Sequence, residues 1–187
     1  MIEEPLSGWA SGWKMWALTR DGLLRSPTPH VAHAAAWTTR EYRAVCPYGE
    51  QQPVTNPGCS CGVYVMASLE AANEWTSRSI YRERSAVLGQ VEIIGRQATD
   101  PGQDVPVVRA AAVRLTTPMY LRPSLARHAP ALASVYGLPF TPPPEAVWVW
   151  TMPTWQQDLR WGAEAFGFAN PAQLAANLAT VLGRRAV

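Results

Sequence analysis

Two apolar segments with the character of β-strands lie on either side of one polar stretch, and this arrangement constrains the fold more than any other feature. The first segment covers residues 86–96 and the second covers residues 107–115. The stretch between them contains Asp100-Pro101-Gly102, which is typical of a turn. Consecutive strands that are joined by a turn pair in antiparallel fashion, so we expect residues 86–115 to form a β-hairpin.

A second hairpin is predicted near the start of the chain. Residues 13–18 read as a strand, Asp21-Gly22 gives the turn signal, and residues 23–26 form the returning strand. Pro27 ends that strand because proline cannot donate a backbone hydrogen bond. Another short strand is expected at residues 40–45, directly before Cys46.

Helical spacing of apolar residues predicts a helix from Met66 to about Tyr81. Residues 121–137 form the next expected helix, with Pro123 in the first turn and Gly137 just past the end. Pro130 inside this segment either kinks the helix or splits it.

The last part of the chain begins with Thr141-Pro142-Pro143-Pro144, a stiff extended linker. Residues 147–150 alternate valine and tryptophan, which predicts a strand, and Asn170-Pro171 fits the start of a C-terminal helix. We therefore expect an α+β domain with a cysteine loop over residues 1–140, and a linker, Trp-rich strand and helix over residues 141–187. A lone strand and helix are marginally stable, so the second part is expected to pack on the same domain.

Together these elements predict an antiparallel sheet that is built from hairpins, with two or three helices packed on it. With 187 residues, 48% of them apolar, the chain is long enough to bury a sizeable core. The net charge of +2 does not by itself indicate a nucleic-acid partner. The acidic start of the chain does not resemble a signal peptide, and no apolar run approaches the roughly 18 residues of a membrane span. We expect a cytoplasmic protein with no membrane partner.

All three cysteines lie in or next to a loop rich in proline and glycine, residues 47–62. A Cys-x-Cys disulfide would be strained, so Cys59 and Cys61 are expected to be reduced thiols. Together with Cys46 they supply three soft ligands for a zinc ion, and His33 is the proposed fourth ligand. His30 and water are alternatives for that position. The competing interpretation is that Cys46 is a small core residue and the Cys-x-Cys has no role.

Several short patterns in order along the first two-thirds of the chain resemble an uncharacterised family of small actinobacterial and actinophage proteins with a C…CxCGxY motif. The resemblance covers roughly residues 12–115, and its family pattern has a histidine shortly before the Cys-x-Cys, where this chain has Gln51-Gln52-Pro53. No activity comes with the resemblance. It is carried by Gly12-Trp13-Lys14-x-Trp16, Asp21-Gly22-x-Leu24-x-Ser26-Pro27, Trp37 with Cys46, Cys59-x-Cys61-Gly62-x-Tyr64, and Val87-x-Gly89-x-Val91 with Gly95-Arg96.

Other groupings have a functional and a structural interpretation. Ser124 and His128 have the spacing of a nucleophile and base on a helix, although Ser124 also suits a helix start. The arginines either form one phosphate-binding stripe or belong to a solvated face of mixed charge, which we favour; they are Arg78, Arg82, Arg84, Arg96, Arg109 and Arg114. Of the C-terminal tryptophans, we expect Trp148 and Trp150 to cover the core and Trp155 or Trp161 to be exposed.

The abundance of tryptophan and arginine, without a convincing catalytic constellation, favours a non-enzymatic binding or accessory protein. A protein partner is preferred over nucleic acid, and an oligomer is allowed. One alternative is an enzyme with a dispersed site that uses His33, Cys61 or His128. The other is a structural component of a virion or complex.

Overall fold

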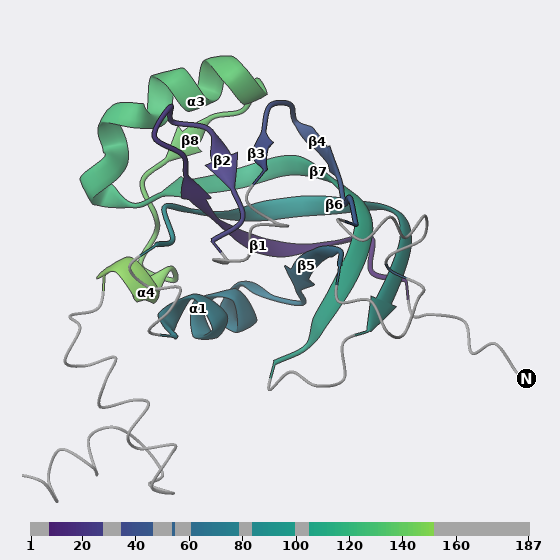
Figure 1. Cartoon of the computed structure of the whole chain (residues 1–187). Coiled ribbons are helices and arrows are strands. Elements are labelled where there is room, and N and C mark those ends of the chain that lie inside the picture. Colours follow the sequence, from purple (N-terminus) through teal and green to yellow (C-terminus); the bar gives the residue numbers. More distant parts are fainter. Residues whose placement is uncertain are drawn as a thin grey trace, which may run out of the picture. The chain divides into compact units, whose positions relative to one another are not determined.

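The computed structural model describes residues 8–27, 35–46, 54, 61–78, 84–99 and 105–151 (Figure 1). Contacts divide the chain into two compact units, Met1–Val147 and Trp148–Val187. The described helix of the second unit is α4, Trp148–Thr151. The described elements of the first unit are, in chain order, β1 (Ser11–Leu18), β2 (Leu24–Arg25), β3 (Ala36–Trp37), β4 (Glu41–Arg43), β5 (Val63–Met66), α1 (Leu69–Ser77), β6 (Val87–Thr99), β7 (Val107–Leu121), η2 (Pro123–His128), α3 (Ala129–Tyr136) and β8 (Phe140–Thr141).

The hairpin predicted over residues 86–115 is confirmed and is longer than expected. β6 and β7 pair in antiparallel register from Val87 opposite Leu121 to Thr99 opposite Val108. The ladder shifts register twice, and Gly95, with a φ of 77°, lies at the second shift. Such bulges bend a strand, which lets this long hairpin curve along the rest of the sheet.

The hairpin predicted near the N-terminus is also confirmed. β1 pairs with β2 in antiparallel fashion, with Leu18 opposite Leu24. The Gly22 amide donates to the Thr19 carbonyl oxygen at 3.0 Å, and the φ of Gly22 is 78°. Glycine adopts this left-handed conformation without a steric penalty, so the Asp-Gly pair fixes the turn.

The strand pairings of the first unit form a closed path. β1 pairs with β6, β6 with β7, β7 with β5, and β5 returns to β1 through the pair Trp13–Met66. These pairs are all antiparallel, but β8 pairs with β7 in parallel. The sheet is therefore mixed, and the prediction of a purely antiparallel sheet is wrong in this respect. The chain passes through η2 and α3 between β7 and β8, and a helical crossover of this kind allows a parallel return.

Two helices cover opposite faces of the sheet. Consecutive residues of a strand point to opposite faces, so Met15 and Trp16 of β1 mark the two sides. Met15 Sδ accepts a hydrogen bond from Thr76 Oγ1 of α1 at 3.1 Å. Trp16 belongs to the buried apolar core that also contains Leu132 and Tyr136 of α3. Figure 1 shows α1 and α3 on either side of the strands. An α+β architecture is thus confirmed.

The helix predicted from Met66 to Tyr81 begins later than expected. Met66 is the last residue of β5, a strand that the sequence did not reveal. α1 begins at Leu69, because Ser68 has an extended backbone and its hydroxyl accepts from the Ala71 amide at 3.1 Å. A serine N-cap of this kind marks where a helix starts more firmly than the apolar spacing does.

The helix predicted over residues 121–137 is split. Leu121 still belongs to β7, Pro123–His128 form the 3₁₀ helix η2, and the α-helix α3 begins at Ala129. Pro130 lies in the first turn of α3, where the missing amide hydrogen costs no hydrogen bond. Gly137, with a φ of 64°, ends α3 as predicted.

The strand predicted over residues 147–150 is wrong. The Val147 amide donates to the Pro144 carbonyl oxygen at 2.9 Å, and the helix α4 follows from Trp148. Four residues are too few for alternation to distinguish a strand from a helix. The predicted C-terminal helix from Asn170, as well as Trp155 and Trp161, lie outside the described residues. Residues 141–147 belong to the first unit, and the packing of residues 148–187 on it stays a prediction.

Candidate functional site

Four side chains from three strands form a cluster in the core, which we call the aromatic-lysine cluster: Lys14, Trp16, Trp37 and Tyr42. The Trp37 ring on β3 lies at its centre. It stacks on Tyr42 of β4 with 4.3 Å between centroids and 5° between planes. The ring of Trp16 on β1 meets it edge-on at 5.4 Å and 85°. Lys14 Nζ lies 5.8 Å from the Trp37 ring centroid.

Tyr136 of α3, about a hundred residues later in the chain, holds the Trp37 backbone in place. Its hydroxyl donates to the Trp37 carbonyl oxygen at 2.6 Å and accepts from the Leu24 amide at 2.9 Å. Both bonds are buried, so the phenol joins β2, β3 and α3 through one oxygen atom. Burial raises the pKa of Tyr136, which keeps the hydroxyl proton available for donation.

Lys14 is the only lysine of the chain, and its side chain is buried. Its Nζ donates a long hydrogen bond of 3.4 Å to the Tyr64 carbonyl oxygen of β5. Burial lowers the pKa of Lys14 to about 8, since the charged ammonium loses its hydration. An amine with this pKa is mostly protonated at neutral pH, so the core holds a positive charge.

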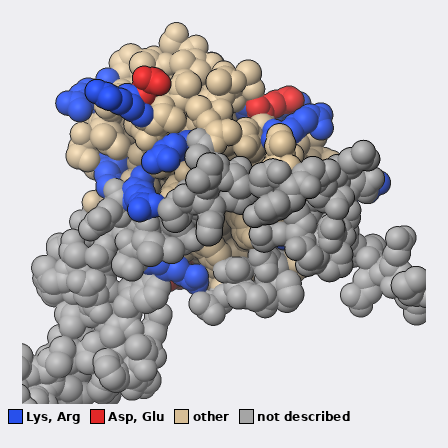
Figure 2. Space-filling model, viewed as in Figure 1, with Lys and Arg blue, Asp and Glu red and all other residues tan. Residues whose placement is uncertain are grey.

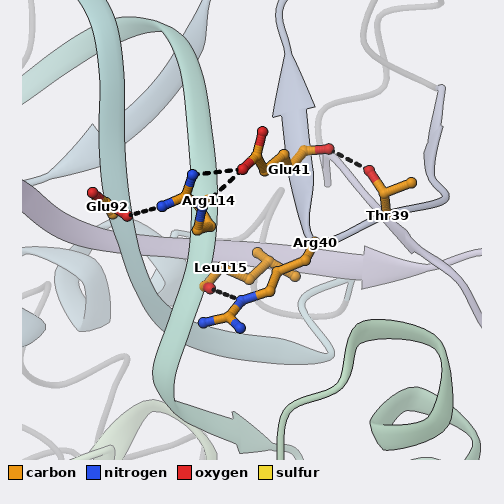
Figure 3. A network of polar contacts seen from close by, with 6 residues as sticks. All are labelled: Thr39, Arg40, Glu41, Glu92, Arg114 and Leu115. Atoms are coloured by element: carbon orange, nitrogen blue, oxygen red, sulfur yellow. Dashed lines mark hydrogen bonds and ion pairs between the residues drawn. The ribbon is translucent and has the colours of Figure 1, made fainter.

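Tyr42 connects the cluster to the surface, because it is half-buried and lies between two exposed residues of β4. Arg40 and Arg43 are both exposed, as is Val45, whose relative exposure is 71%. The Arg40 guanidinium is oriented by its Nε, which donates to the Leu115 carbonyl oxygen at 2.8 Å (Figure 3). We call Arg40, Tyr42, Arg43 and Val45 the β4 surface.

A network of charged side chains holds β4 against the long hairpin, as Figure 3 shows. Arg114 of β7 lies between two carboxylates, with Nη2 2.7 Å from Glu41 Oε1 and Nη1 2.9 Å from Glu92 Oε2. The hydrogen bond and charge of Glu41, followed by the charge of Glu92, raise the pKa of Arg114. Each of these groups is partly exposed, so the network contributes more to the register of β4 than to stability.

One edge of β4 pairs with β7, and the structure describes no strand on its other edge. The Arg40 carbonyl oxygen and the Ala44 amide bond to β7, so Glu41 and Arg43 direct their backbone groups outward. Thr39 Oγ1 donates to the Glu41 carbonyl oxygen at 2.6 Å and satisfies one of these groups. The described residues supply no partner for the backbone groups of Arg43, which lie at this open edge.

The two ends of the cysteine loop are held next to each other by β7. The Ala44 amide donates to the Ala111 carbonyl oxygen at 2.9 Å, and Val63 pairs with Ala110. Residues 45–62 therefore leave and re-enter the sheet at neighbouring positions of β7, between β4 and β5. This backbone pairing holds the base of the loop on β7.

Cys46 and Cys61 are both buried at this base. The Cys61 carbonyl oxygen accepts from Arg109 Nη1 at 3.2 Å. Cys59 and His33, the other two predicted zinc ligands, lie outside the described residues, as does His30. Among the described residues there is no group of three or more His, Cys, Asp or Glu that could hold a metal ion. The zinc site stays a prediction.

The arginines that were considered for a phosphate-binding stripe have separate environments. Arg109 is buried, Arg114 is paired with two carboxylates, and the Arg78 guanidinium lies 4.6 Å from the Trp75 ring centroid. Arg82 lies outside the described residues. Figure 2 shows basic groups directly beside acidic groups at two places on this face, as expected of a surface with mixed charge.

The residues proposed for a dispersed enzyme site lie on different elements. Cys61 precedes β5, whereas His128 ends η2 near Gly22 of the first hairpin turn. His128 Nε2 accepts from Arg127 Nε at 3.3 Å. Ser124 is exposed in the first turn of η2, which agrees with its interpretation as a helix-start residue.

Sequence reasoning missed the aromatic-lysine cluster. Its members are far apart in the chain, and β3 is only two residues long, so no local pattern places Trp37 beside Tyr42. One signal was present: Lys14, the single lysine, lies inside the apolar strand pattern between Trp13 and Trp16. A charged residue in an apolar strand is expected either to reach solvent or to be buried beside groups that stabilise its charge.

The chain was compared with family models, curated proteins and solved structures. No family model, no curated protein and no solved structure matches it. None of the described helices has the length and apolar character needed to cross a membrane.

Proposed function

We propose that this chain is a non-enzymatic binding protein that recognises a protein partner through the β4 surface. The observation that carries the proposal is the stack of half-buried Tyr42 on buried Trp37, 4.3 Å apart and nearly parallel. A tyrosine whose ring is already ordered loses little conformational entropy when a partner packs on it.

The composition of the β4 surface supports a protein partner. Tyrosine, tryptophan and arginine are the residues that dominate binding energy at protein interfaces. Arg40 and Arg43 are exposed on either side of Tyr42, and Val45 adds an exposed apolar group. The open edge of β4 also offers the Arg43 backbone groups to an added extended segment. The nearby arginines favour acidic side chains on that segment.

The proposal is tested with three single variants of the full chain. Proteins captured from an actinobacterial extract, with and without phage infection, are purified and titrated by calorimetry. We expect Tyr42→Ala and Arg43→Glu each to weaken binding of a true partner about tenfold or more. Val135→Ser, which changes an exposed residue on α3, is the matched control and leaves affinity unchanged.

Equal affinity of all four proteins for every captured partner would overturn the proposal. Capture of nucleic acid with binding that falls steeply with salt would favour the nucleic-acid alternative instead. A native mass of a large closed assembly would favour a structural role in a virion or complex. The zinc ion that Cys46, Cys59, Cys61 and His33 are predicted to hold is tested separately, by elemental analysis of the purified protein.

A further inference from the structure

Among the described residues, the buried Lys14 has no counter-ion. Loss of hydration is the cause of its lowered pKa, and no carboxylate contributes to the shift. An ammonium group has three N–H donors, and a buried charge is normally both paired and hydrogen-bonded. Within the described part of the chain, Nζ has one carbonyl acceptor, Tyr64 O at 3.4 Å, and lies 5.8 Å from the Trp37 ring centroid.

A second donor on the same face of β1 has no acceptor among the residues that the structure describes. Trp16 is fully buried, and its Nε1 finds no hydrogen-bond partner. Residues two apart in a strand share a face, so Lys14 and Trp16 project to the same side of β1. Both also contact the Trp37 ring. This part of the core therefore has more buried donors than acceptors.

We propose that Lys14 and Trp16 form a binding site for one small monovalent anion, either a halide ion or the carboxylate group of a ligand. A single negative charge matches the single ammonium, and it supplies the acceptor that the indole N–H lacks. A divalent anion such as sulfate would leave an uncompensated charge in the core. Lys14 and Trp16 do not belong to the β4 surface, since both are buried whereas Arg40 and Arg43 are exposed. The two sites share one neighbour, because Trp37 contacts Lys14 and Trp16 and stacks on Tyr42.

Thermal unfolding of the full chain at pH 6.5 and constant ionic strength tests this proposal. Chloride, bromide and formate are titrated against sodium sulfate as the reference salt. We expect a saturable rise in Tm of roughly 2–5 °C for the monovalent anions when their concentration is ten times Kd. A rise in Tm with the halides but not with formate identifies a halide site. A rise with formate but not with the halides identifies a carboxylate site.

Trp16→Phe removes the N–H donor and keeps an aromatic side chain, so the anion-dependent rise should disappear. Trp13→Phe is the matched control, because Trp13 lies on the opposite face of the same strand and stacks on Tyr120. The proposal is overturned by the absence of any anion-specific rise, or by a rise of the same size in Trp16→Phe. If Trp16→Phe does not fold, a bromide-soaked crystal of the unaltered protein decides: the proposal requires an anomalous peak within about 4 Å of Lys14 Nζ.

Discussion

Burial in the core disfavours the charged form of Lys14. The free energy of unfolding therefore depends on pH. The native pKa is about 8, against an ordinary value of 10.5. Below pH 8 the amine is protonated in both the folded and the unfolded chain. As pH rises from 8 to 10.5, the unfolded chain retains the proton that the native protein has released, so stability increases.

We therefore expect the difference in unfolding free energy between the unaltered protein and Lys14→Met to change across this window. The unaltered protein should gain on the order of 3 kcal/mol relative to the variant between pH 8 and pH 10.5. Tyr42 and Tyr136, whose pKa values are raised by burial, titrate in both proteins and cancel in the difference. Urea denaturation of both proteins, in buffer without halide or carboxylate, measures this difference in unfolding free energy. A difference that does not change with pH would show that the pKa of Lys14 is not lowered in the native protein.

The Tyr136 hydroxyl is the second residue whose removal has a specific expected cost. Tyr136→Phe leaves the Leu24 amide and the Trp37 carbonyl oxygen buried without their partner. We expect a loss of about 2–4 kcal/mol in unfolding free energy, because unsatisfied buried groups carry their desolvation cost. Tyr120→Phe is the control, since the described residues give its hydroxyl no hydrogen bond, and it should stay within about 0.5 kcal/mol of the unaltered protein.

At the scale of elements, the two hairpins and the short strand expected at residues 40–45, observed as β4, were predictable, whereas β3, β5 and β8 were not. β6 and β7 carry their own apolar β pattern, and the Asp21-Gly22 turn determines β1 and β2 locally. β3 and β8 have two residues each and exist because another strand pairs with them. Neither the Trp37–Tyr42 stack nor the burial of Lys14 follows from local sequence, because both depend on these long-range pairings.

Gly12 marks the point at which β1 and β5 come closest. A Cβ atom there would lie 2.5 Å from Val65 Cγ1 and 2.6 Å from the Met66 carbonyl oxygen. Gly12→Ala should therefore separate β1 from β5 next to their single Trp13–Met66 pair, at a cost of about 1–3 kcal/mol. Hydrogen exchange should become faster in β5 of this variant.

The neighbouring substitution Ser11→Ala is the control for Gly12→Ala. Ser11 is exposed at the start of β1, so its replacement should leave both stability and exchange in β5 unchanged. Unchanged exchange in Gly12→Ala would show that the closed path of strands does not depend on this close approach.

At the scale of the whole molecule, the cysteine loop is an insertion between two strands that follow one edge of β7. β4 ends opposite Ala112 and β5 begins opposite Ala110. A loop whose ends are already joined by the sheet adds little to the entropy cost of folding, and loops on rigid scaffolds commonly carry function.

The boundary of the first unit gives the last prediction. The sequence places the linker at residue 141, whereas contacts divide the chain after Val147. Asn73 Nδ2 of α1 donates to the Ala146 carbonyl oxygen at 2.8 Å, and Val147 is fully buried. A chain of residues 1–147 should thus be more stable than one of residues 1–140, by at least about 2–4 kcal/mol, because it keeps the buried valine, the Asn73–Ala146 hydrogen bond and Thr141 of β8. Differential scanning fluorimetry of the two truncated chains and of Asn73→Ala in the longer one measures this. Equal melting temperatures for the two truncated chains would place the structural boundary at the proline linker after all.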